Sequence, residues 1–178
     1  MTRPPFEPIL PRDLDIVQRQ LGRTPRDVVG IAARCVCGAP TVVATKPRLA
    51  DGTPFPTFYY LTHPGATAAL SALEAAQLMI EFNRMLETDP ALADGYRRAH
   101  HEYLADRAQF GLVDEISDTS AGGMPVRVKC LHALGAHSLA AGPGVNPVGD
   151  LALAAADWSP ERCSCASYDE VEADTEPV

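Results

Sequence analysis

The spacing of apolar residues divides the first sixty positions into one short helix and a small β-region. Apolar side chains at helical spacing, followed by Gly22, predict a helix over residues 12–22. Two β-branched runs on either side of a turn-like Cys-Gly-Ala-Pro predict a β-hairpin within residues 27–45. A proline-rich loop follows, and residues 58–61 are expected to form a third strand. These segments indicate a small antiparallel sheet.

Helical spacing dominates the rest of the chain, and a proline suited to a first helical turn opens each long helix. One helix is predicted over residues 64–86, a second over residues 90–111 and a third over residues 125–142. One more short helix is expected within residues 142–158. The fold class is therefore α+β, with the hairpin and the third strand forming a small antiparallel sheet packed against three principal helices.

Composition places these elements in one domain. The chain has 178 residues, of which 46% are hydrophobic and 21% charged, the balance of an ordinary globular protein. This length can bury roughly two thirds of the unfolded surface, so neither a metal nor a disulfide is needed for folding alone. From Ser159 onward the sequence is polar and acidic. We predict a single globular domain over residues 1–158 and a disordered acidic tail over residues 159–178.

The charge pattern narrows the choice of partners. The net charge is −8, and only Lys46 and Lys129 among the 15 cationic residues are lysines. Such a chain repels phosphate backbones over most of its surface, so general nucleic-acid binding is disfavoured and a protein partner stays open. No apolar run approaches the ~20 residues needed to span a membrane, and the N-terminus lacks the apolar core of a signal peptide. A cytoplasmic location is therefore expected.

The cysteines add candidate chemistry. They are Cys35, Cys37, Cys130, Cys163 and Cys165, and four of them form two C-x-C pairs. A reducing cytoplasm keeps thiols reduced, and the odd number argues against a disulfide framework. Metal binding, thiol chemistry and plain burial are the alternatives that this pattern leaves.

Four distinctive blocks occur in this order along the chain: RCVCGAP, PRLADGTPFPTFYYLTHP, GGMPVRVKCLHALGAH and AGPGVNPVGDLAL. They resemble DUF501, an actinobacterial family of unknown function, over roughly residues 15–158. The resemblance implies genes nearby for a septum-formation initiator, an exopolyphosphatase-like protein and enolase. It also implies that a cysteine often stands where this chain has His63. A soft metal site tolerates that exchange, because both side chains bind zinc.

We predict a metal site formed by Cys35, Cys37, His63 and Cys130. The first two lie at the expected hairpin tip, where Gly38 relaxes the backbone beside two thiolates. His63 lies at a strand-to-helix junction, and Cys130 lies on the third long helix. Zinc is the first choice because it prefers four Cys and His ligands, and an iron–sulfur cluster is the alternative. Four protein ligands leave no position for water, so the metal is expected to be mainly structural and to join the hairpin to the helix.

Two nearby histidines are assigned supporting roles. In a regular helix His132 points about 200° away from Cys130, and His137 lies about 10 Å further along the axis. Both are therefore expected to hydrogen-bond to the ligands or to replace one of them.

A thiol-dependent enzyme is the main alternative. In that hypothesis Cys130 is a nucleophile that His132 or His137 activates, with Lys129 and Arg127 stabilising the thiolate. The chain has no recognisable nucleophile elbow or phosphate-binding loop, so the reaction and its catalytic residues stay open. A non-catalytic interaction protein linked to cell division or envelope physiology is a further hypothesis, and it predicts an exposed apolar patch.

Overall fold

Three antiparallel strands form the sheet, in the order β1 (Val28–Arg34), β2 (Pro40–Thr45) and β3 (Tyr59–Leu61). The structure is a computed structural model that describes residues 3–162 and 164–165. The central strand β2 is buried along its whole length. Its β-branched residues suit a strand that packs on both faces.

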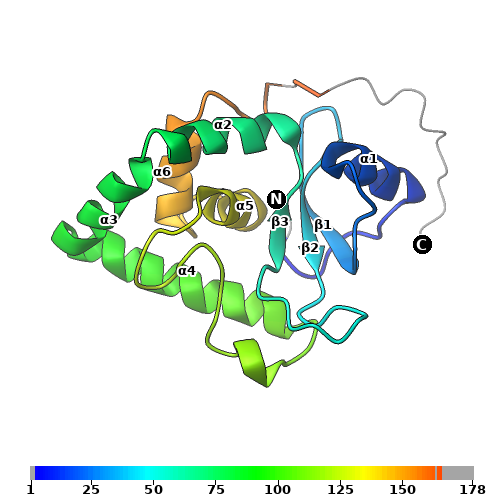
Figure 1. The fold of residues 1–178 in the computed structure, drawn as a ribbon, viewed down its shortest axis with the longest axis horizontal. Coiled ribbons are helices and arrows are strands. Elements are labelled where there is room, and N and C mark those ends of the chain that lie inside the picture. The colour runs from blue at the N-terminus through cyan, green and yellow to red at the C-terminus, as the bar shows by residue number, and fades with distance from the viewer. Residues whose placement is uncertain (1–2, 163, 166–178) are drawn as a thin grey trace.

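Successive residues of the sheet face two different layers. Ile31 and Val43 pack with Val17 of α1 (Pro11–Leu21) on one side. The opposite face of the sheet joins the main core, which contains α5 (Leu131–Ala141). Figure 1 shows the sheet between these two helices. The alternation of side chains along a strand is what allows one sheet to serve both layers.

Helix α5 is buried because it is apolar on all sides, and it packs against the sheet, α2 (Pro64–Ala75) and α6 (Pro147–Ala155). On α6, a Cβ atom at Gly149 would lie 2.4 Å from the carbonyl oxygen of Leu134, so α5 and α6 cross too closely for a side chain there. Helix α3 (Leu78–Thr88) packs against α2 and α4 (Pro90–Ala108), and α4 packs against α6. The 3-10 turn η1 (Asp114–Ile116) follows α4.

The predicted α+β fold is confirmed, with two differences in the helices. The helix predicted over residues 64–86 is interrupted at Gln77, where φ is 61°, and forms α2 and α3. The third predicted helix begins at Leu131 and not at Pro125. Just before it, the side chain of Asn83 accepts a hydrogen bond from the Val128 N–H at 2.9 Å and donates to the Val128 carbonyl at 3.0 Å. These bonds give the backbone an alternative to helix.

Buried polar groups fix α4 against β3. The Tyr103 hydroxyl accepts hydrogen bonds from the N–H groups of Phe58, at 2.5 Å, and Tyr59, at 3.3 Å. The Tyr59 hydroxyl donates to Asp106 at 2.8 Å, and Arg3 binds the same carboxylate at 2.8 Å. These bonds fix the position of β3, and the residues that directly follow β3 in the chain are therefore fixed in position too.

The segment after α6 returns to the tip of the hairpin, as the orange part of Figure 1 shows. The Val36 N–H donates to the Pro160 carbonyl at 2.9 Å, and Trp158 is buried. Of the tail predicted over residues 159–178, positions 163 and 166–178 lie outside the described residues. No helix in the described part of the chain is long and apolar enough to cross a membrane.

Candidate metal centre

The hairpin between β1 and β2 ends in a tight turn that carries two cysteines. The Gly38 N–H donates to the Cys35 carbonyl at 2.8 Å, and Gly38 has a φ of 88°, which favours glycine. Arg34 anchors the turn, because its guanidinium donates to the Gly38 carbonyl at 2.9 Å and pairs with Asp13 at 2.6 Å. The turn leaves Cys35 buried and Cys37 exposed.

His63 lies where β3 passes into α2 and caps the N-terminus of that helix. Its Nδ1 atom accepts hydrogen bonds from the N–H groups of Gly65, at 3.1 Å, and Ala66, at 3.3 Å. Burial lowers the pKa of the His63 imidazole, so the neutral ring is favoured. A neutral ring that accepts at Nδ1 carries its proton on Nε2. The Trp158 ring, 5.1 Å away between centroids, covers one side of the imidazole.

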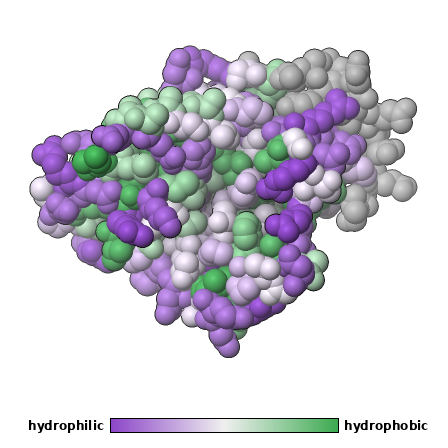
Figure 2. All heavy atoms as spheres, in the orientation of Figure 1, coloured by the Kyte–Doolittle hydropathy of each residue, from purple (hydrophilic) through white to green (hydrophobic). Residues whose placement is uncertain are grey.

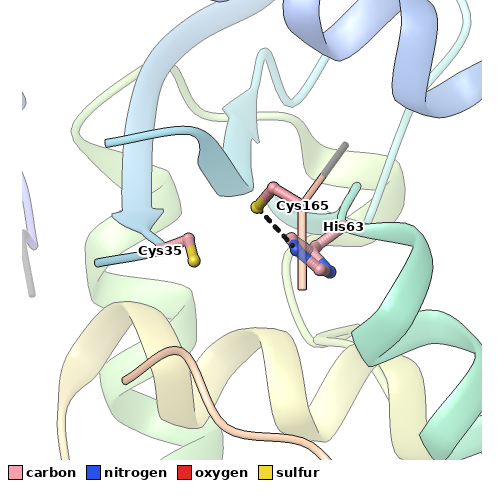
Figure 3. A group of neighbouring side chains, drawn as sticks. All are labelled: Cys35, His63 and Cys165. Carbon is pink, nitrogen blue, oxygen red and sulfur yellow. Dashed lines mark hydrogen bonds between the residues drawn. The ribbon is translucent and has the colours of Figure 1, made fainter. Parts of the chain in front are cut away.

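Cys165 connects these two features. Its Sγ atom lies 3.1 Å from His63 Nε2 and 3.4 Å from Cys37 Sγ. One ligand atom from each of Cys35, His63 and Cys165 lies within 4.8 Å of the other two. Figure 3 shows the Cys35 sulfur directed toward the other two side chains. Three segments that are far apart in the sequence therefore meet at Cys35, His63 and Cys165, and Cys37 contacts Cys165 from the hairpin turn. We call these four residues the hairpin cluster: Cys35, Cys37, His63 and Cys165.

The hairpin cluster has the donors that a soft metal ion requires. With a Zn–S bond of about 2.3 Å and a Zn–N bond of about 2.0 Å, ligand atoms of a tetrahedral site are about 3.5–3.8 Å apart. The separations of 3.1 and 3.4 Å that Cys165 makes with His63 and Cys37 are slightly shorter. Side-chain shifts of a few tenths of an ångström would therefore match these two separations. Cys37 is not among the residues whose ligand atoms all lie within 4.8 Å of one another, so its sulfur must move farther to bind the same ion as Cys35, His63 and Cys165.

Cys130 lies in a second group, which we call the helix-cap cluster: Glu74, Cys130 and His132. One ligand atom from each residue lies within 4.8 Å of the others. Cys130 is the N-cap of α5 and has an extended backbone, so the regular-helix geometry assumed for the sequence does not apply to it. As a result His132 Nδ1 lies 3.8 Å from Cys130 Sγ, and it lies 3.1 Å from Glu74 Oε1.

The four predicted ligands are thus divided between two clusters. Cys35, Cys37 and His63 lie in the hairpin cluster, and Cys130 lies in the helix-cap cluster. His137 lies in neither, because it is buried against Tyr59 and Tyr103 and accepts a hydrogen bond from Asn146.

The helix-cap cluster differs from a catalytic triad. In a triad, one imidazole nitrogen faces the nucleophile and the other faces the carboxylate. In this cluster Glu74 and Cys130 both face Nδ1 of His132, and Nε2 lies 3.1 Å from the Thr67 carbonyl. The contact with Cys130 is the largest of the effects that raise the pKa of His132 to about 9, and Glu74 and the Thr67 carbonyl add to it. A protonated imidazole cannot act as a general base, so this geometry does not favour activation of Cys130 by proton removal.

Sequence reasoning did not assign Cys165 or Glu74 to a site. Cys165 lies in a segment whose acidic composition resembles a tail, and the available signal was the repeat of the C-x-C spacing at positions 163–165. Cys163 itself lies outside the described residues. Glu74 has the pattern of an ordinary helical glutamate, so the sequence carries no signal for it.

The exposed surface offers few large apolar side chains. Val36, Ile80, Leu112 and Val126 are the exposed large hydrophobic residues of the described chain, and they come from separate segments. Figure 2 shows hydrophilic residues interspersed with hydrophobic ones over the face that it displays. Isolated apolar residues of this kind are ordinary on a protein surface and do not define a docking patch.

Comparison with known proteins identifies the family. No curated protein and no solved structure matches the chain. The family model for the protein of unknown function DUF501 matches residues 31–154, which include most of the hairpin, the helix-cap cluster and α5. Cys165 lies eleven residues beyond the matched region. The match covers more than half of the sequence, and the chain therefore belongs to the DUF501 family.

Proposed function

We propose that the protein binds a zinc ion through Cys35, Cys37, His63 and Cys165. The observation that carries this proposal is the position of Cys165 Sγ, which lies 3.1 Å from His63 Nε2 and 3.4 Å from Cys37 Sγ. Relative to the ligands predicted from the sequence, Cys165 takes the place of Cys130. The replacement rests on distance, because Cys130 groups with Glu74 and His132.

The donor set favours zinc in a structural role. Three sulfurs and one imidazole nitrogen complete a tetrahedral site, which leaves no position for a substrate or a water molecule. The ion would join the hairpin tip, the start of α2 and the segment after α6. Binding energy gained in the folded state adds directly to the free energy of unfolding, so the ion would stabilise this arrangement. Thiolate ligands must stay reduced, which supports the cytoplasmic location.

Metal binding requires a change at His63. Nε2 carries the ring proton when Nδ1 accepts the two backbone hydrogen bonds, and a metal cannot bind a protonated nitrogen. Either the ring proton moves from Nε2 to Nδ1, which then no longer accepts from the two backbone N–H groups, or the ring turns so that Nδ1 faces the sulfurs. Both changes alter the surroundings of the Gly65 and Ala66 N–H groups, so the NMR signals of these two amides report directly on metal loading.

The zinc content of protein purified without a histidine tag tests the proposal. We expect an ion that survives dialysis against a weak chelator in the native chain and in Ser164→Ala, which alters the neighbour of Cys165. The ion should be lost from Cys165→Ser and from Cys35→Ser. Folded native protein that holds no metal would overturn the proposal, and a brown protein with visible absorption would replace zinc by the iron–sulfur alternative.

A further inference from the structure

The helix-cap cluster joins two helices at their ends. Glu74 lies in the last turn of α2, Cys130 is the N-cap of α5 and His132 is the second residue of α5. The Glu74 carboxylate accepts a hydrogen bond from the Leu131 N–H at 2.6 Å, which orients it toward the imidazole. A carboxylate has two oxygens with several lone pairs, so this bond leaves it able to bind a cation.

The imidazole of His132 is oriented as metal-bound histidines are. Its Nε2 atom lies 3.1 Å from the Thr67 carbonyl, which can only accept, so Nε2 carries a hydrogen. In the metal-free protein the raised pKa of His132 keeps Nδ1 protonated as well. A metal ion would displace that proton, and the lone pair freed on Nδ1 faces Glu74 Oε1 at 3.1 Å and Cys130 Sγ at 3.8 Å. A backbone carbonyl on the outer nitrogen is the usual partner of a metal-ligating histidine. The hairpin cluster lacks this feature, because His63 accepts at its outer nitrogen.

We propose that Glu74, Cys130 and His132 form a second metal site for a divalent ion of the zinc class. Carboxylate, thiolate and imidazole are all ligands that zinc accepts. The side chains of Glu74 and His132 are each 25% exposed, so solvent reaches the cluster. Three protein ligands leave the fourth position to an exchangeable water, which distinguishes this site from the closed hairpin cluster. The ion here binds more weakly and exchanges with metal in solution.

The competing explanation is an ion pair that caps α5 and binds no metal. Both explanations use the contact between Glu74 and His132, and both predict that replacing either residue lowers stability. They differ over Cys130, because a capping ion pair does not need the sulfur, whereas a metal site gains a sulfur–metal bond. The test must therefore detect that bond.

Addition of Co²⁺ to the zinc-loaded protein detects a sulfur–metal bond at Cys130 by absorption spectroscopy. We expect a sulfur-to-cobalt charge-transfer band that saturates near one equivalent per chain, while zinc stays in the hairpin cluster. The band should be lost in Cys130→Ser and in His132→Gln, and it should persist in Ser71→Ala, whose hydroxyl contacts His132 Nε2 at 3.0 Å. Glu74→Gln keeps an oxygen for the Leu131 N–H and should weaken cobalt binding about tenfold or more.

Two controls separate this proposal from the hairpin cluster and from loss of the fold. Circular dichroism of each variant shows whether α5 is still formed. The zinc content of each variant, measured in the same samples, shows whether the hairpin cluster is loaded. Loss of metal binding at one cluster can therefore be distinguished from loss at the other. A cobalt band of equal strength in Cys130→Ser, or no band in the folded native protein, would overturn the second site.

Discussion

His63 combines two roles that can be separated by substitution, since it caps α2 and is a proposed ligand. His63→Asn keeps a side-chain oxygen that can accept from the helix N–H groups, whereas His63→Ala does not. We expect both variants to lose the zinc ion. In metal-free conditions, chemical denaturation should show His63→Ala less stable than His63→Asn by about 1 kcal/mol, the usual value of an N-cap bond. Retention of zinc by His63→Asn would remove His63 from the ligand set.

His137 makes the stability of the fold depend on pH. Burial lowers its pKa to about 3, with the nearby positive charge of Arg3 adding to the effect, and the surrounding Tyr59, Tyr103 and Asn146 supply no negative charge. In the unfolded chain the imidazole takes up a proton near pH 6.5, its ordinary value. Between pH 6.5 and 3 the unfolded state therefore binds more protons, and stability must fall as the pH falls.

This contribution is measurable by unfolding the protein in denaturant at several pH values. We expect His137 to account for a loss of about 1.4 kcal/mol for each pH unit below about 6. His137→Gln should flatten this dependence, and His101→Gln, at an exposed position, should leave it unchanged. A His137→Gln variant with the slope of the native protein would show that His137 is not the source.

The sequence predicts the position in the fold of residues that stand next to a glycine turn or a proline. Cys35 and Cys37 stand beside a glycine turn, and His63 stands between a strand and a proline-opened helix, so their places could be derived. Cys130 was placed inside a helix because Pro125 has the features of a first helical residue. Tertiary hydrogen bonds from Asn83 hold the backbone of Val128 outside a helix, and no local pattern reveals such a partner.

At the scale of elements, the crossing of α5 and α6 depends on Gly149. A Cβ atom there would lie 2.4 Å from a backbone oxygen of Leu134, so one helix would have to move. We expect Gly149→Ala to destabilise the protein by about 3 kcal/mol, the upper part of the range for overpacking. Thermal and denaturant unfolding measure this change.

A control separates steric overlap from backbone strain. Gly52 has a φ of 88° with open space around it, so Gly52→Ala tests strain alone and should cost about 1–2 kcal/mol. If Gly149→Ala is as stable as the native protein, the close helix crossing is not a constraint on the fold.

The element pattern was predictable where periodicity and capping agree. Apolar spacing gave the hairpin, the third strand and most of each helix, because burial on one face leaves a regular signal. The break at Gln77 was missed because glutamine is a good helix former, and the left-handed conformation that it adopts carries no sequence signature.

At the scale of the whole molecule, the metal would hold the C-terminal segment on the hairpin. Removal of the ion with a strong chelator should therefore speed hydrogen exchange at the Val36 amide, which donates to the Pro160 carbonyl. Amides in the middle of α5, far from the hairpin turn in sequence and buried in the core, should keep their protection. Exchange followed by mass spectrometry checks both regions, and equal protection of Val36 with and without metal would contradict the clamp.

In the proposed site three sulfurs and one imidazole hold a zinc ion at the hairpin tip, and X-ray absorption at the zinc edge identifies these ligands. The Cys130→Ser variant is the sample of choice, because it lacks the sulfur of the helix-cap cluster. We expect three sulfur neighbours at about 2.3 Å and one nitrogen at about 2.0 Å around the ion that survives a weak chelator. A first shell of only nitrogen and oxygen, or an unchanged first shell in the Cys165→Ser protein, would contradict it.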